Sequence, residues 1–173
     1  MKKYIFLKWF IFSIAVAINL FIIINAFING EASAKESNSI AHMTADAINT
    51  IKPETITPQN FDEFAFGLRK TVGHFGLFAL SGVFSTWSFY LFFKERKVGY
   101  FLWEILISSG FGFVVALVSE FVQLFVEGRA GAWSDVGIDF SGYFLGIFVI
   151  ILVLLIKKSK IFWMKFYMKN QAE

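Results

Sequence analysis

The sequence predicts an all-α integral membrane protein, a small bundle of four transmembrane helices with both termini in the cytoplasm. The first observation behind this prediction is composition: 57% of the 173 residues are hydrophobic and the mean hydropathy is +0.63. A soluble domain of this composition would expose large apolar patches. The second observation is that four stretches each hold about the twenty mostly apolar residues that a spanning helix needs, at residues 4–27, 71–93, 101–126 and 136–156.

The third observation is the distribution of Lys and Arg, which indicates how the spans are oriented. Loops on the cytoplasmic side of a membrane carry an excess of these residues. With the N-terminus in the cytoplasm, eleven of the sixteen fall on that side and five on the other. The eleven are Lys2, Lys3, Lys8, Lys94, Arg96, Lys97, Lys157, Lys158, Lys160, Lys165 and Lys169, and the five are Lys35, Lys52, Arg69, Lys70 and Arg129. High Phe, Ile and Lys usage hints at a bacterial source, so we expect a multi-pass protein of a bacterial plasma membrane.

Residues 1–28 are expected to form the first transmembrane helix and to act as a signal anchor. The rival interpretation is a cleaved signal peptide, since Ala32-Ser33-Ala34 resembles a signal-peptidase site. The apolar run exceeds twenty residues, whereas the apolar region of a signal peptide has about 7–15. A retained span is therefore favoured.

Two further segments flank the spans. Residues 29–70 are predicted to be extracytoplasmic and to include an interfacial helix, for which Asn60 and Glu63 form a capping pair. Apolar residues then recur at helical spacing up to Leu68, so this helix should lead into the second span. Residues 157–173 mix Lys with aromatic side chains and predict a basic cytoplasmic tail attracted to anionic lipid.

Composition also excludes several classes of function. The chain has no cysteine, which excludes disulfides, thiolate metal sites and cysteine catalysis. The net charge is +3 and the charges are scattered, so a nucleic-acid partner is not expected. No cofactor is expected, and the oligomeric state is left open.

Three of the spans share a pattern, a charged end above a face of small side chains. The faces are Lys70, His74, Ser81, Ser85 and Ser88 on the second span, Glu120, Gln123, Ala116, Gly112 and Ser109 on the third, and Asp135, Asp139, Gly142 and Gly146 on the fourth. Small residues let membrane helices approach closely. We therefore expect these three spans to pack through these faces, with their charged ends converging near the outer surface.

Glu120 is the strongest single signal. It lies about six residues inside the end of the third span, roughly 9 Å deep at about 1.5 Å per residue. A lone carboxylate there costs several kcal/mol, so it should be paired or face a wet cavity. Its available partners are His74, Lys70, Arg69 and Arg129. An ion-pair cluster that only fixes helix registry is one interpretation, and a functional pocket is the other.

The polar spacings resemble those of the VanZ-like membrane protein family. The matching residues are Arg69-Lys70-x-x-x-His74, Glu120-x-x-Gln123, Arg129, and Asp135 with Gly142 seven residues later. The resemblance extends over residues 69–146 and implies a small polytopic membrane protein with a three-helix core at residues 71–156. The family takes its name from a member associated with low-level resistance to teicoplanin, and the resemblance implies no particular reaction.

Two functions compete for the charged cluster. The first is binding of an anionic lipid or lipid-linked envelope precursor by Arg69, Lys70, His74, Glu120, Gln123, Arg129, Asp135 and Asp139, with an effect on teicoplanin susceptibility. The second is an intramembrane enzyme that acts on envelope phosphate or glycan lipids, with His74 and Glu120 as acid and base. The carboxylates of Glu120, Asp135 and Asp139 are hard oxygen ligands, but their spacing is not diagnostic and no residue is assigned as a metal ligand. Transport and a purely structural role are lesser alternatives.

Overall fold

The computed structural model describes residues 2–93 and 100–170, within which all regular structure is helical. The elements are α1 (Lys2–Ala26), α2 (Gly30–Ile51), α3 (Phe61–Leu68), the π-helix η1 (Arg69–Gly76), α4 (Leu77–Phe93), α5 (Tyr100–Gln123) and α6 (Trp133–Asn170). Three of the basic residues counted to orient the spans lie outside the described residues, namely Lys94, Arg96 and Lys97.

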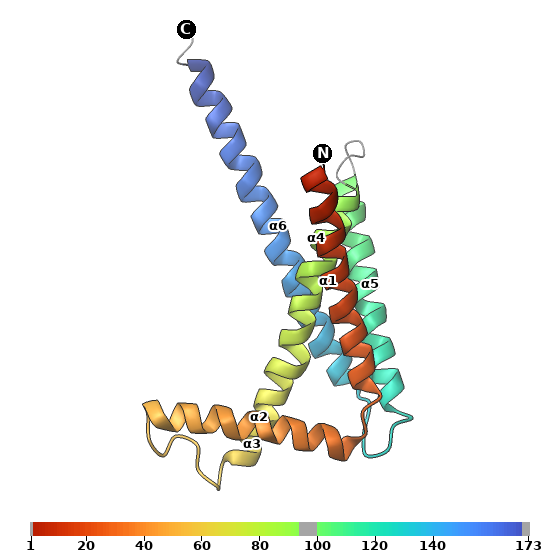
Figure 1. Ribbon diagram of the computed structural model, residues 1–173, viewed down its shortest axis with the longest axis vertical. Helices are drawn as coiled ribbons and strands as arrows, with labels where there is room; N and C mark the ends of the chain where they lie inside the picture. Colours follow the sequence, from red (N-terminus) through yellow and green to blue (C-terminus); the bar gives the residue numbers. More distant parts are fainter. Residues whose placement is uncertain (1, 94–99, 171–173) are drawn as a thin grey trace.

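The predicted four-span architecture is confirmed. Four stretches are long and apolar enough to cross a membrane, namely Tyr4–Ala26, Phe61–Phe93, Leu102–Gln123 and Trp133–Lys160. Figure 1 shows α1, α4, α5 and α6 running along one another, with α2 lying across one end of the bundle. The N-terminal end of α1 and the C-terminal end of α6 both point away from α2, although α6 diverges from the other helices toward its end. The distribution of Lys and Arg predicts that both ends face the cytoplasm.

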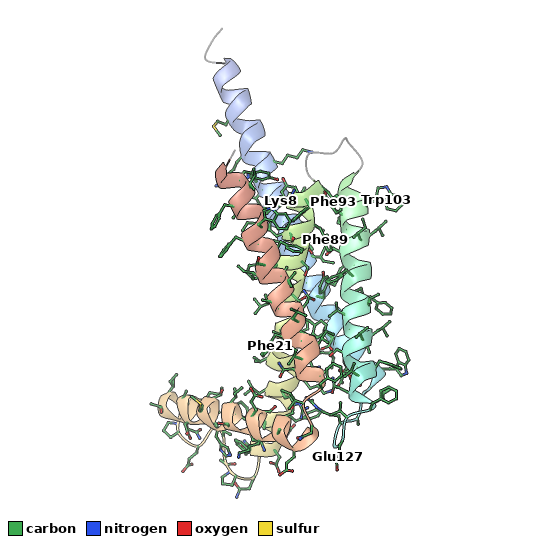
Figure 2. The ribbon with its side chains drawn as sticks, turned by 45° about the vertical axis from the view of Figure 1, so that its right-hand side comes forward. Lys8, Phe21, Phe89, Phe93, Trp103 and Glu127 are labelled. Atoms are coloured by element: carbon green, nitrogen blue, oxygen red, sulfur yellow. The ribbon has the colours of Figure 1, made fainter. Side chains whose placement is uncertain are left out.

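The surface of the bundle is apolar and part of its interior is polar. Large side chains such as Phe21, Leu102 and Phe121 are exposed, and apolar side chains line the outside of the helices in Figure 2. Ser81 and Ser108 are fully buried. This is the arrangement of a bundle in lipid, where helix contacts depend on small residues and polar side chains rather than on apolar burial.

Glycine permits a close approach of α6 to η1 and α4. A Cβ atom added to Gly142 would overlap the carbonyl group of Phe75, and one added to Gly146 would overlap that of Ala79. Gly112 of α5 leaves room in the same way for the ring of Tyr143. The glycines predicted on the third and fourth spans therefore lie at helix contacts, whereas Ser81 and Ser85 of the second span bond to Asn19 of α1.

Helix α1 is joined to α4 by side-chain hydrogen bonds. Asn19 Nδ2 donates to Ser85 Oγ at 3.1 Å, and Ser81 Oγ donates to Asn19 Oδ1 at 2.9 Å. Near the opposite end, Tyr4 OH donates to the carbonyl oxygen of Leu91 at 2.7 Å. In an apolar environment such bonds favour a bundle in which α1 is an integral part.

The helix that begins at Phe61 runs without a break through η1 into α4, so it leads into the second span as predicted. The polar segment differs from expectation in one respect. The expected capping bond of Asn60 is absent. Its side chain instead accepts a hydrogen bond from the Thr57 N–H at 2.8 Å and donates to the Thr55 carbonyl at 3.1 Å, because it closes the turn after Ile51.

The two remaining boundary differences lie at the ends of spans three and four. Helix α5 ends at Gln123, three residues earlier than expected, and the turn that follows contains Gly128 at φ +71°. Helix α6 continues through the predicted basic tail to Asn170. Its 38 residues extend about 57 Å at about 1.5 Å per residue, well beyond a hydrocarbon core of about 30 Å.

Candidate functional site

The π-helix η1 presents the basic residues of the site. Arg69, Lys70 and His74 all lie within its eight residues, Arg69–Gly76. Gly73 and Gly76 weaken the α-helical preference of this segment. A π-helical turn holds one more residue than an α-helical turn, and such turns are frequent at functional sites. The predicted shared face of Lys70 and His74 is retained, since both point to α6.

Two contacts join η1 to α6, four residues apart along each helix. Lys70 Nζ forms an ion pair with Asp135 Oδ1, which also accepts a hydrogen bond from Ser134 Oγ at 3.2 Å. We call Lys70 and Asp135 the outer pair, because they lie nearer the end of the bundle. Further in, His74 Nδ1 lies 3.0 Å from Asp139 Oδ1, within hydrogen-bonding distance.

Glu120 of α5 completes a buried group with His74 and Asp139, which we call the inner cluster. Its Oε1 accepts a hydrogen bond from Gln123 Nε2 at 2.9 Å, and its Oε2 accepts one from the Ala132 N–H at 3.0 Å. His74 Nδ1 lies 3.9 Å from Glu120 Oε1. The carboxylate is therefore oriented by an amide and by a backbone N–H group, and it faces the imidazole of His74.

Arg129 joins the turn after α5 to the end of α1. Its Nε donates to the Ile28 carbonyl at 3.0 Å, one terminal nitrogen to the Asn25 carbonyl at 3.1 Å, and the other to Gln123 Oε1 at 3.4 Å. The guanidinium thus binds backbone carbonyl groups at and just after the C-terminal end of α1. Burial, and then the nearby charge of Arg69, lower the pKa of Arg129.

Arg69 and Arg129 line the same cavity, of about 180 Å³, which we call the arginine pocket. Among the described residues, no carboxylate oxygen lies within 4 Å of either guanidinium. The rest of the lining is partly polar and partly apolar, and includes Ser33, Glu36, Ser37, His74, Gln123, Phe21, Ile22, Ile40 and Leu77. The pocket lies beneath α2, between α1, α4 and α5.

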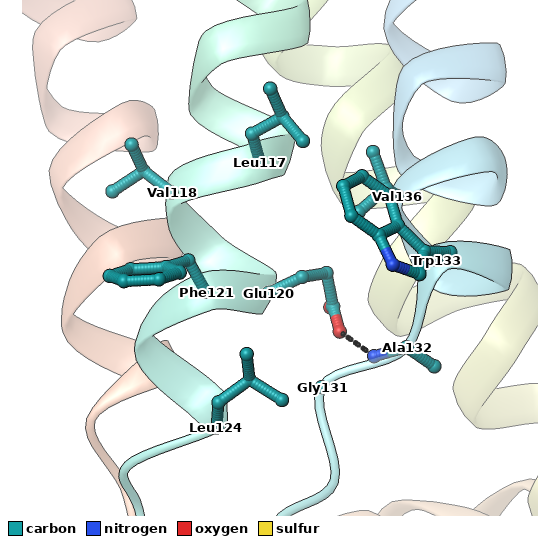
Figure 3. A pocket seen from close by; sticks show the side chains of 9 residues that line it. All are labelled: Leu117, Val118, Glu120, Phe121, Leu124, Gly131, Ala132, Trp133 and Val136. Carbon is teal, nitrogen blue, oxygen red and sulfur yellow. Dashed lines mark hydrogen bonds between the residues drawn. The ribbon is translucent and has the colours of Figure 1, made fainter.

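A second cavity, of about 360 Å³, lies between α5 and the start of α6. Figure 3 shows apolar side chains around it, with Glu120 reaching across to the Ala132 N–H. Its lining is Leu117, Val118, Glu120, Phe121, Leu124, Gly131, Ala132, Trp133 and Val136. Glu120 is the only ionisable residue of that lining, so the inner cluster borders an apolar cavity on one side.

The fold and these contacts agree with a comparison against protein families. The family model described as VanZ/LLP1 matches residues 9–155. The chain belongs to the VanZ/LLP1 family. The match extends the resemblance noted over residues 69–146 to most of the chain, including α1 and α2. No curated protein and no solved structure matches the chain. Four apolar helices and this family indicate a VanZ/LLP1 protein of the plasma membrane.

The eight residues predicted for the site of this VanZ/LLP1 protein fall into three groups. Lys70 and Asp135 form the outer pair, His74, Glu120 and Asp139 form the inner cluster, and Arg69, Arg129 and Gln123 line the arginine pocket. The structure thus brings all eight to one end of the bundle, but it places the arginines apart from the carboxylates.

Sequence reasoning missed the contribution of α2 to the arginine pocket. Ser33, Glu36, Ser37 and Ile40 recur at helical spacing on one face of α2, and this periodicity could have identified them. The backbone groups that bind Glu120 and Arg129 leave no signal in the side-chain pattern, because any residue supplies them.

Proposed function

We propose that this VanZ/LLP1 family protein binds the anionic headgroup of a membrane lipid or lipid-linked envelope precursor in the arginine pocket. The observation that carries the proposal is the pair of arginines on one cavity. Among the described residues, neither has a carboxylate within 4 Å. A phosphate or carboxylate group would supply the missing counter-charge, and arginine binds such groups with paired, charge-assisted hydrogen bonds.

The electrostatics of Arg129 support an anionic ligand. Burial lowers the pKa of this guanidinium, and repulsion by Arg69 lowers it further. Three of its hydrogen bonds go to carbonyl oxygens, which are neutral acceptors. The protein therefore brings two guanidinium groups to one cavity, with Glu120 and Glu36 nearby but no carboxylate within 4 Å among the described residues, and a bound anion would reduce their repulsion.

The apolar part of the lining supports an amphiphilic ligand. Phe21, Ile22 and Leu77 border the pocket together with the polar side chains of α2. The pocket lies where α1 and α5 end, so its depth is that of a lipid headgroup and the first part of its chain. A lipid phosphate would lie against the arginines while its chain contacts the apolar residues.

Lipid binding is tested by retention of anionic lipid on the purified full chain. Arg69→Ala removes one guanidinium for which the described residues provide no ion pair, and Lys52→Ala is the matched control on the same end of the molecule but outside the pocket. With phosphatidylglycerol in mixed micelles, native mass spectrometry should show about tenfold weaker retention in Arg69→Ala, since a charged hydrogen bond contributes about 1.5–3 kcal/mol. Equal retention in the two variants would contradict the proposal.

We also propose that the arginine pocket lies on the extracytoplasmic side, in the outer leaflet. The supporting observation is the excess of Lys and Arg at the other end of the bundle. The chain has no cysteine, so single cysteines can be introduced without a background. Ser39→Cys on α2 should react with a membrane-impermeant maleimide in intact cells, and Ser159→Cys on α6 only after permeabilisation. The reverse labelling pattern would contradict this orientation.

In cells, lipid binding by the arginine pocket should change susceptibility to teicoplanin. Teicoplanin carries a lipid tail, and a protein that binds outer-leaflet lipids would alter how the antibiotic anchors in the membrane. Cells that express the wild-type chain should tolerate more teicoplanin than cells that express Arg69→Ala at equal protein level. Vancomycin, which lacks such a tail, serves as the comparison, and an equal response to both antibiotics would contradict this mechanism.

A further inference from the structure

The inner cluster contains three groups that can ligate a metal ion. His74 Nδ1 and one carboxylate oxygen each from Glu120 and Asp139 all lie within 4.8 Å of one another. They come from three separate elements, η1, α5 and α6. A cation bound at about 2.1 Å from each ligand holds its ligands no more than about 4.2 Å apart. The separations from His74 Nδ1, 3.0 Å to Asp139 and 3.9 Å to Glu120, fall within that limit, and the two carboxylate oxygens, at most 4.8 Å apart, would need to move only slightly closer.

Asp139 supplies independent evidence that the cluster is incomplete. Its side chain is fully buried, and its Oδ2 atom has no hydrogen-bond partner. Buried polar atoms are almost always paired, and a buried carboxylate without compensation is especially costly. The unpaired oxygen therefore lies in the same cluster as the three candidate ligands.

The charge of the cluster points to a cation of charge two. Two carboxylates, Glu120 and Asp139, share a single imidazole, because Lys70 is paired with Asp135. With both carboxylates ionised and the imidazole protonated, one negative charge would remain in the cluster. A divalent cation bound by a neutral imidazole and two carboxylates would leave no net charge.

We propose that His74, Glu120 and Asp139 bind a divalent transition-metal ion, with Zn²⁺ and Mn²⁺ as the best candidates. Imidazole favours Zn²⁺ over Mg²⁺ or Ca²⁺, and carboxylates also suit Mn²⁺. Gln123 and the Ala132 N–H orient Glu120, as hydrogen-bond donors commonly do for carboxylates that ligate metals. This site differs from the carboxylate grouping considered from the sequence, since His74 takes the place of Asp135.

The site borders both cavities. His74 also lines the arginine pocket, and Glu120 lines the apolar cavity. Three protein ligands leave a coordination position for water or a ligand oxygen. The metal proposal does not rest on lipid binding, because none of its ligands is an arginine.

The two histidines of the chain provide a matched test. His42 stacks on Phe61 with ring centroids 4.1 Å apart and takes no part in the cluster. The full chain, expressed with Zn²⁺ and Mn²⁺ in the medium and purified with its affinity tag removed, is measured by inductively coupled plasma mass spectrometry. We expect about one metal ion per wild-type chain and per His42→Gln chain, and at least tenfold less in His74→Gln.

Carboxylate variants separate metal binding from folding. Asp139→Asn should lose the metal in the same way, whereas Asp135→Asn, with the same change on the same helix, should keep it. If Asp139→Asn does not fold, the wild-type chain still tests the proposal: EDTA should lower its unfolding temperature, and added Zn²⁺ or Mn²⁺ should restore it. Arg69→Ala should keep the metal even if it loses lipid, which keeps this test distinct from the lipid test.

Two outcomes would overturn the proposal. One is wild-type protein that contains no bound metal and whose unfolding temperature does not change on addition of Zn²⁺ or Mn²⁺. The other is equal metal content in His74→Gln and His42→Gln. Either result would leave the inner cluster as a hydrogen-bonded group that fixes helix registry.

Discussion

The outer pair and the inner cluster make the same connection in different surroundings. Each places a basic side chain of η1 opposite an aspartate of α6, four residues apart along both helices. In the outer pair, the side chains of Lys70 and Asp135 are 25% and 12% exposed, and each charge has one partner. In the inner cluster, Asp139 is fully buried, and two carboxylates share one imidazole.

This difference assigns helix registry and ligand binding, which the sequence left as alternatives, to two separate contacts. The outer pair needs nothing beyond protein and water, so it is suited to fixing the register of η1 against α6. The inner cluster leaves Asp139 Oδ2 without a partner, which is unusual for a buried polar atom and favours a ligand site there. One end of the bundle therefore holds both a structural contact and a candidate ligand site.

The largest effect is expected from a substitution that disrupts the outer pair and the inner cluster together. Gly142→Val inserts a side chain where a Cβ alone would overlap the Phe75 carbonyl, so α6 must move away from η1 and α4. The cost should exceed the roughly 3 kcal/mol typical of overpacking. Gly137→Val is the control, because nothing lies within 4 Å of an added Cβ there. Recovery of folded protein in detergent should collapse only for Gly142→Val, and similar recovery of both would contradict the close approach.

The next largest loss of stability is expected from a substitution in the inner cluster. His74→Ala removes the imidazole that faces Glu120 and Asp139, and loss of one member of a buried pair costs about 3–5 kcal/mol. Because His74 is 15% exposed, we expect about 2–3 kcal/mol, measured by chemical unfolding in detergent. Adding Asp139→Asn should recover part of this loss, since it removes an unpaired buried charge. A double variant less stable than His74→Ala would contradict that explanation.

Much of this arrangement could be predicted from helical periodicity. The spacing of Asp135, Asp139, Gly142 and Gly146 identified the face that α6 turns to α4, because one side of a helix must carry both the small residues and the charges. Glu120 was identified because a carboxylate within a span needs a partner. These inferences depend only on which residues share a face, which a sequence does specify.

Other features depend on the paths of loops, which side-chain spacing does not determine. Arg129 has the charge of a ligand-binding residue, but the turn after α5 brings it to the carbonyls of Asn25 and Ile28. The same turn places the Ala132 N–H against Glu120. The π-helical geometry of η1 was not predicted either, since its sequence is also compatible with an α-helix.

The smallest effect is expected for the outer pair. Its measurement tests whether burial makes the contact between His74 and Asp139 stronger than the contact between Lys70 and Asp135. Partly exposed ion pairs contribute about 0–1 kcal/mol, so Lys70→Met and Asp135→Asn should each lower stability by about 1 kcal/mol or less. A double-mutant cycle of these changes should give a small coupling energy, well below that of the corresponding cycle for His74 and Asp139. Because both pairs join the same two helices, a general loosening of η1 would affect both cycles alike. Equal coupling energies would therefore show that burial does not distinguish the pairs, and the separation of a registry contact from a ligand site would fail.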